Sequence, residues 1–317
     1  MYREGLPMPL WGFLLSFLAA AMWAVSPIMV NHGVAISKCS IHEINPYRAV
    51  PFFAASLIIA LINTGGDITL VTSPLVYLYL FAGVFAGYLL GDLFYFVAIR
   101  EIGVSLAIPV ANGYPILVIF TSWLLLGEPV TAKILWGVIV VVFGVLLLRF
   151  GGEGSKETND VARALHNKRR LMKGFAFAIA AGCCWALSAP LTKLVIVTSG
   201  LSPTEVTFYR SFAFLVISVI ARIVVVKYRP ESTVPLLKVS PAAALYFAGA
   251  SVIGLCLGSI AYAACLVVMP VAIVTAITAT SPFIAALFGH FVLKERLMKP
   301  QWIGVALIIV GSVVVGI

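Results

Sequence analysis

The stretch LLLGEPVTAKILWGVIVVVFGVLLL (residues 124–148) decides the fold, because its pattern returns at the end of the chain as FVLKERLMKPQWIGVALIIVGSVVVGI (residues 291–317). Each copy places one glutamate ahead of an apolar segment that carries two spaced glycines. The matching residues are Glu128, Gly137 and Gly144 in the first copy and Glu295, Gly304 and Gly311 in the second. This recurrence indicates an internal duplication, which fixes the architecture before any other feature is considered.

The duplication extends upstream over most of the chain. At nearly constant spacing, Trp23, Glu43, Tyr47, Arg48, Gly87, Gly91, Tyr95 and Pro115 recur as Trp185, Glu205, Tyr209, Arg210, Gly254, Gly258, Tyr262 and Pro282. We therefore expect two repeats, at 10–150 and 172–317. The segment between them, 151–171, is rich in Gly, Ser, Asn and charged residues, a composition typical of a linker loop.

The composition excludes an ordinary soluble protein. Hydrophobic residues make up 62% of the 317 residues and charged residues only 10%, whereas soluble domains carry about 25% charged residues. A membrane-spanning helix needs about 20 apolar residues. Candidate spans lie at 10–31, 46–63, 74–99, 103–126, 132–149, 172–197, 203–225, 241–266, 269–292 and 300–316. Because helices satisfy their own backbone groups in lipid, the sequence predicts an all-α integral membrane protein.

The number of spans predicts how the repeats are oriented. Five spans per repeat is an odd number, so the second repeat enters the membrane from the opposite side. The prediction is ten transmembrane helices arranged as two inverted five-helix repeats, an arrangement used by many secondary transporters.

The distribution of basic residues predicts the orientation in the membrane. Most Lys and Arg residues fall in the linker and in loops on the same side as the linker, whereas the opposite side holds Arg3 and Lys133. The positive-inside rule places the linker in the cytoplasm and both termini outside, in a multi-pass protein of the plasma membrane. The net charge of +9 is thus interpreted as a topology signal and not as a nucleic-acid interface.

Two prolines predict a central binding site. Pro115 and Pro282 interrupt the fourth and ninth spans at matching positions, and interrupted spans at corresponding places in two repeats mark the binding sites of transporters. Polar residues gather around these helix breaks. Those taken as candidate binding residues are Asn112, Tyr114, Thr278 and Ser281.

Asp92 is the strongest single candidate for function. It lies well inside the third span, where an acidic residue costs about 2.5–3.5 kcal/mol on insertion scales and therefore faces a cavity or a partner. One interpretation makes it a proton-coupling site or the counter-ion of a cationic substrate group. The alternative is a neutral, hydrogen-bonded side chain that braces Tyr95 or another helix.

Further candidates come from aromatic and basic residues in the spans. Trp23 and Trp185 either flank a cavity or anchor the membrane interface, and Tyr95 and Tyr262 can line a pocket with their hydroxyls. Lys193, near the end of the sixth span, either extends to the interface or lines the cavity as an anion site.

The repeated segments resemble a known family. Residues 124–148 and 291–317 are similar to the end of an EamA domain, and two such units in tandem resemble the ten-helix branch of the drug/metabolite transporter superfamily. The resemblance implies a basket-like bundle, a central cavity and alternating access for a small polar or amphipathic solute, such as an amino acid or nucleobase. Members of this branch usually have cytoplasmic termini, whereas the loop charges here favour the opposite orientation.

The sequence therefore predicts a secondary transporter, with a proton coupled through Asp92 as one option, and not an enzyme. A lipid-carrier flippase is the alternative within transport, and an integral-membrane enzyme ranks below both. Motifs of metalloproteases, serine hydrolases and P-loop ATPases are missing from the sequence, so no cofactor and no metal are expected. The expected partners are a small-molecule solute and the bilayer, with a monomer or homodimer as the assembly.

Overall fold

The computed structural model describes residues 9–37, 44–147, 168–228, 239–281, 284 and 299–316. Regular structure within these ranges is helical. The predicted break at Pro282 lies outside the described residues, and so does most of the predicted linker, 151–167. Its last residues, 168–171, belong to a helix.

The helices of the first repeat are α1 (Leu10–Ser37), α2 (Asn45–Thr64), α3 (Pro74–Val84), α4 (Asp92–Ile102), α5 (Val104–Ala111), α6 (Tyr114–Leu126) and α7 (Ala132–Leu147). Those of the second are α9 (Lys168–Ser199), α10 (Pro203–Tyr228), α11 (Pro241–Ala250), α12 (Ser259–Val268), α13 (Val271–Thr278) and α15 (Lys299–Gly316). Among the described residues, 6 continuous helical segments are long and apolar enough to cross a membrane. The predicted all-α membrane fold with two five-helix repeats is confirmed.

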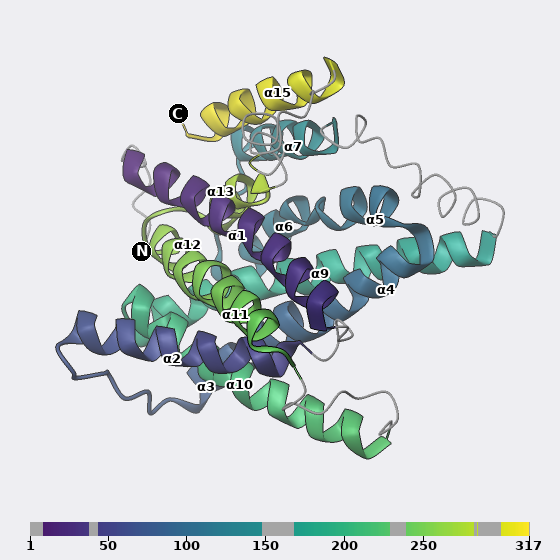
Figure 1. The fold of residues 1–317 in the computed structure, drawn as a ribbon. Coiled ribbons are helices and arrows are strands. Elements are labelled where there is room, and N and C mark those ends of the chain that lie inside the picture. Colours follow the sequence, from purple (N-terminus) through teal and green to yellow (C-terminus); the bar gives the residue numbers. More distant parts are fainter. Residues whose placement is uncertain are drawn as a thin grey trace.

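The two repeats interlock, and each helix packs against the other repeat in a matching way. α1 packs against α11 and α12, and its counterpart α9 packs against α3 and α4. Equivalent helices also pair directly: α2 with α10, and α7 with α15. Figure 1 shows α7 and α15 lying together at one side of the bundle. Both repeats therefore contribute to the interior.

Glycines let the paired helices approach closely. A Cβ atom added to Gly144 would lie 2.8 Å from the carbonyl oxygen of Gly304, and one added to Gly311 would lie 2.9 Å from that of Gly137. Small residues supply packing in membranes, where lipid weakens the hydrophobic drive between helices. These repeated glycines explain how α7 and α15 come into backbone contact.

Two π-helical segments interrupt the third and eighth spans at equivalent positions. The segment η2 (Phe85–Gly91) joins α3 to α4, and η6 (Ser251–Gly258) joins α11 to α12. Such segments are rare and often mark functional sites. Sequence periodicity did not predict them. Both face the centre of the bundle, where they help to shape the cavity described next.

Candidate functional site

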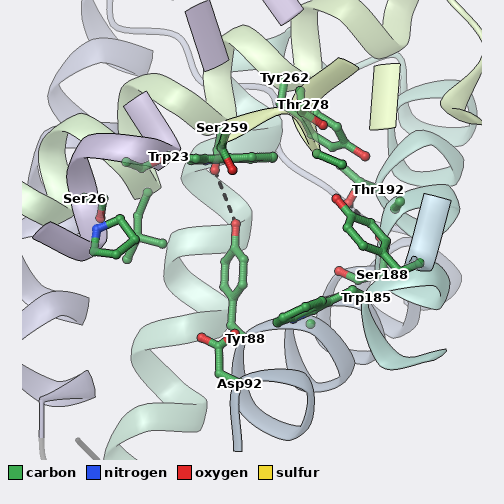
Figure 2. A pocket seen from close by; sticks show the side chains of 18 of the residues that line it. Trp23, Ser26, Tyr88, Asp92, Trp185, Ser188, Thr192, Ser259, Tyr262 and Thr278 are labelled. Atoms are coloured by element: carbon green, nitrogen blue, oxygen red, sulfur yellow. Dashed lines mark hydrogen bonds between the residues drawn. The ribbon is translucent and has the colours of Figure 1, made fainter. Parts of the chain in front are cut away.

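A central cavity of about 320 Å³ lies between the repeats and is lined by residues of both. Its walls come from α1, α2 and α6, from α9, α10 and α13, and from the two π-helical segments with the helices that follow them. Figure 2 shows the labelled side chains gathered around one central space. Small-molecule sites usually span about 300–1,000 Å³, so this volume suits a small solute.

Most of the residues predicted from the sequence meet at this cavity. Those that line it are Trp23, Asp92, Asn112, Tyr114, Trp185, Tyr262, Thr278 and Ser281. Tyr95 and Lys193 are not among the lining residues. Tyr95 lies behind Trp185, with the two rings 5.2 Å apart, and Lys193 is engaged in an ion pair nearer one end of the bundle.

The two tryptophans occupy symmetric places in the wall. The ring of Trp23 lies 5.2 Å from that of Tyr262, which matches the spacing of their counterparts Trp185 and Tyr95. Trp23 donates its indole N–H to the carbonyl oxygen of Gly254 at 3.0 Å. These large rings give the cavity an apolar, aromatic lining, which suits the apolar part of a ligand.

The tryptophans fit only because glycines face them. A Cβ atom on Gly258 would lie 2.8 Å from Nε1 of Trp23, and one on Gly91 would lie 2.6 Å from Nε1 of Trp185. The π-helical segments end at these two glycines. The repeated glycines at these positions thus shape the cavity wall as well as the helix packing.

Three charged side chains face the cavity among its described lining residues: Arg48, Asp92 and Arg210. Arg48 interacts electrostatically with the Asp92 carboxylate, and Trp185 is a side-chain hydrogen-bond partner of that carboxylate. The close ion pairs among the described residues involve Glu101 and Glu128, not Asp92. Asp92 therefore remains available to a ligand or a proton in the cavity.

The two arginines were missed as site residues by the sequence analysis. They occupy equivalent positions near the start of α2 and α10, so the duplication already contained the signal. Because each arginine lies close to a loop in the sequence, it resembled a surface residue or a residue that only stabilises the fold. Only the packed bundle shows that both turn toward the centre.

Arg210 is the more completely buried of the two, with 7% of its surface exposed. It donates a hydrogen bond to the hydroxyl of Thr192, and its guanidinium lies 5.2 Å from the centre of the Tyr88 ring. Its Nε has no hydrogen-bond partner among the residues that the structure describes, and the same is true of Nε of Arg48. Unpartnered buried donors are rare in proteins, so these two N–H groups can donate to a molecule that enters the cavity.

Tyr88 connects the repeats across the cavity. Its hydroxyl lies 3.2 Å from Oγ of Ser259, the counterpart of Asp92 in the second repeat (Figure 2). Tyr88 belongs to η2, so a π-helical turn sets the direction of its side chain. Sequence alone does not distinguish Tyr88 from aromatic residues that face lipid.

The fourth span is broken beside the cavity. α5 ends at Ala111, a turn at Asn112 and Gly113 follows, and α6 begins at Tyr114 with Pro115 in its first turn. Because the N-terminus of a helix carries unpaired N–H groups and a partial positive charge, this end of α6 favours an anion nearby.

A buried ion pair closes the bundle at the end where α6 and α9 finish. Nζ of Lys193 lies 2.7 Å from Oε1 of Glu128 and donates to the carbonyl oxygen of Met269 at 2.8 Å. The other oxygen of Glu128 accepts from the backbone N–H of Val271 at 2.9 Å. Together these contacts tie α6, α9 and the start of α13 to one another.

A second polar cluster reinforces the same end. Glu205, near the start of α10, accepts from the backbone N–H groups of Thr69 and Ser202. The hydroxyl of Tyr209 donates to the carbonyl oxygen of Thr69 at 2.8 Å. The loop between α2 and α3 is thereby fastened to α10, and an apolar core fills the space below it.

The cavity presents groups that can bind a small molecule. No group of three or more His, Cys, Asp and Glu side chains that could hold a metal ion occurs within the part of the chain that the structure describes. What the cavity does present is a pair of guanidiniums, one carboxylate, several hydroxyls and an aromatic wall.

Comparison with known proteins agrees with this architecture. The EamA-like transporter family matches residues 10–150 and again residues 172–317. An uncharacterized transporter of Archaeoglobus fulgidus is 26% identical over 298 residues, which cover 94% of this chain and 95% of that protein. A protein of known crystal structure superposes with a TM-score of 0.71 at 14% identity over 96% of both chains, which shows a shared fold.

Proposed function

The chain belongs to the EamA-like transporter family, and we propose that it is a secondary transporter that moves a small polar or amphipathic metabolite by alternating access. The observation that carries the proposal is the cavity itself. It lies between two inverted repeats, it is small and partly polar, and its charged groups have unused hydrogen-bonding capacity. Transporters built from inverted repeats bind their solutes in this position.

We further propose that Asp92 couples transport to a proton. Asp92 lines the cavity, and Arg48 is the charge that acts on it. A proton on Asp92 removes the carboxylate charge that balances Arg48, so protonation changes the charge that the cavity offers to a solute. Protonation and binding are then linked, and a pH gradient can drive transport.

The experiment is solute uptake into proteoliposomes that contain a pH-sensitive dye. Amino acids, nucleobases and carboxylic acids are added outside, with and without an imposed pH gradient. We expect one class to enter and to move protons with it. A wild-type protein that moves none of these classes, although it is folded and correctly inserted, contradicts the transport proposal.

The role of Asp92 is tested with a matched pair of variants. Asp92→Asn removes the carboxylate from the cavity, whereas Asp67→Asn makes the same change on an exposed loop side chain. We expect Asp92→Asn to abolish proton movement and Asp67→Asn to retain it. Uptake by Asp92→Asn that still follows the pH gradient removes Asp92 from the mechanism.

The distribution of charge supports an orientation as well. Arg100, Lys168, Arg169, Lys173 and Lys227 lie at the end of the bundle opposite the Lys193–Glu128 ion pair. With this end in the cytoplasm, both termini are outside, and the plasma membrane is the expected location. In this proposed orientation the buried ion pair lies at the outer end and closes the bundle toward the outside.

A further inference from the structure

We propose that Arg210 is the recognition group for a carboxylate, so that the solute is a small organic monoanion with an apolar or aromatic body. This inference rests on the proposed transport function and names the chemical class of the solute. Four features of the cavity support it: an unpaired cation, the balance of charge, the aromatic wall and the end of a broken helix.

The unpaired cation is Arg210. Its side chain is buried, and within the described part of the chain its partners are the Thr192 hydroxyl and the face of the Tyr88 ring, both of them uncharged. A buried charge without a counter-ion is strongly unfavourable unless a ligand neutralises it. The guanidinium is a planar fork of donors that fits a carboxylate through two parallel hydrogen bonds, and its Nε is still unpartnered.

The charge balance of the cavity favours one negative charge. The positive charge of Arg48 is opposed by Asp92, whereas Arg210 has no such opponent among the described lining residues. With these three groups ionised, the cavity carries a net positive charge of one unit. A monoanion therefore neutralises it, and a solute with a net positive charge would be repelled.

The aromatic wall and the size of the cavity describe the rest of the solute. Trp23, Tyr114, Trp185 and Tyr262 surround the space, and aromatic rings of this kind pack against flat apolar groups. The volume of about 320 Å³ limits the solute to a small molecule. A carboxylate joined to a ring or a short hydrocarbon meets both conditions.

The N-terminus of α6 gives a second source of positive potential. Asn112 and Tyr114, on either side of the helix start, both line the cavity, so the first turn of α6 lies next to it. The partial positive charge of a helix N-terminus is stabilising for an anion. This feature accompanies the buried guanidinium and does not stand alone as a site.

The test uses three planar molecules of nearly the same shape that differ in charge: benzoate, benzamide and benzamidine. Their affinities for the purified protein in detergent are measured by titration calorimetry at one pH. We expect benzoate to bind roughly tenfold more tightly than benzamide, because hydrogen bonds between charged groups are stronger than those of a neutral amide. Benzamidine should bind most weakly.

Two variants and one control assign the preference to Arg210. Arg210→Gln should reduce the benzoate-to-benzamide ratio to near unity, whereas Arg210→Lys should retain part of it because the charge remains. Lys227→Gln removes an exposed charge from the same helix and should leave the ratio unchanged. Thermal unfolding of each protein checks that the variants are folded. If Arg210→Gln does not fold, the comparison of Arg210→Lys with the wild type still tests the role of Arg210.

Equal affinity for benzoate and benzamide, no binding of benzoate, or a preference for benzamidine overturns the inference. So does a benzoate preference that survives in Arg210→Gln. Because binding is measured without a membrane, the result is independent of the uptake assay. If the protein transports a neutral solute and shows no preference for benzoate, the proposal of a carboxylate site is wrong, and the proposal of transport still stands.

Discussion

Nζ of Lys193 and Oε1 of Glu128 lie 2.7 Å apart in a buried ion pair whose side chains are only 11% and 12% exposed. The pair joins the end of α9 to the residues after α6, and through Met269 and Val271 it also holds the start of α13. Lys193 was a candidate for the substrate site, and the structure places it instead at the closure of one end of the bundle.

The first prediction concerns the strength of this closure. Lys193→Gln leaves Glu128 as an uncompensated buried charge, which costs about 3–5 kcal/mol. We expect a large loss of unfolding free energy, measured by denaturant titration in detergent micelles. The double variant Lys193→Gln with Glu128→Gln should lose less than either single variant, because no lone charge remains.

The exposed pair between Lys173 and Glu101 is the matched control. It has the same 2.7 Å separation, but the lysine side chain is 54% exposed. Lys173→Gln should therefore change stability by only about 0–1 kcal/mol. Equal losses at the two pairs would mean that the Lys193–Glu128 pair is solvated and does not close the bundle.

The second prediction concerns the contact between α7 and α15. A Cβ atom at Gly144 would meet the backbone oxygen of Gly304 at 2.8 Å and the backbone nitrogen of Ile308 at 3.0 Å. Backbone cannot move aside as a flexible side chain can, so Gly144→Ala should destabilise the protein by about 1–3 kcal/mol.

Gly182→Ala is the control for this contact, since its Cβ atom would come no closer than 3.3 Å to the nearest atom, the carbonyl oxygen of Ala111. A small loss of stability, or a gain from the higher helix propensity of alanine, is expected there. The measurement is thermal unfolding of both variants in the same detergent. A Gly144→Ala protein as stable as the wild type would show that α7 and α15 are not in close contact.

Much of this architecture could be predicted because it follows from composition and duplication. Continuous apolar segments required helices, and the odd number of spans required inversion. Asp92 was identified because an acidic side chain inside a span is costly, and Trp23 and Trp185 because they recur. These signals lie in single residues or in their repetition, and they do not depend on how the helices pack.

The missing parts of the site depend on packing. Arg48 and Arg210 recur as clearly as the tryptophans, but a residue near the start of a span can face lipid, water or the centre of the bundle. Tyr88 belongs to a π-helical turn, which changes the direction of its side chain. The spacing of apolar residues in the sequence does not predict such a turn. The partner of Glu205 is a loop backbone that comes close only in the folded bundle.

The third prediction separates the two contacts of Tyr88. Its ring lies under Arg210, and its hydroxyl reaches Ser259. Tyr88→Phe keeps the ring, whereas Tyr88→Leu removes a cation–π contact of about 0.5–2 kcal/mol. In the benzoate titration, Tyr88→Leu should therefore alter affinity more than Tyr88→Phe. Equal effects of the two variants would show that the hydroxyl, which both variants lack, and not the ring positions the guanidinium.

The fourth prediction concerns orientation. Loop charges favour both termini outside, in contrast to the usual orientation that the family resemblance implied. We expect epitope tags at the N- and C-termini to react with an impermeant antibody on intact cells, and a tag in the linker to react only after permeabilisation. If the terminal tags react only in permeabilised cells, the orientation is the reverse of the predicted one, and the Lys193–Glu128 pair lies at the cytoplasmic end of the bundle.

The central claim is that the cavity between the repeats opens alternately to the two sides of the membrane. Ala189→Cys places a thiol in the cavity wall, in a protein whose native cysteines are replaced by serine or alanine. An impermeant thiol reagent is then applied to either side of reconstituted vesicles. With the ion pair intact, labelling should come from the linker side, and the double glutamine variant of Lys193 and Glu128 should shift it toward the side of the termini. Labelling that is equal from both sides in both proteins, or absent from both, would contradict alternating access through this cavity.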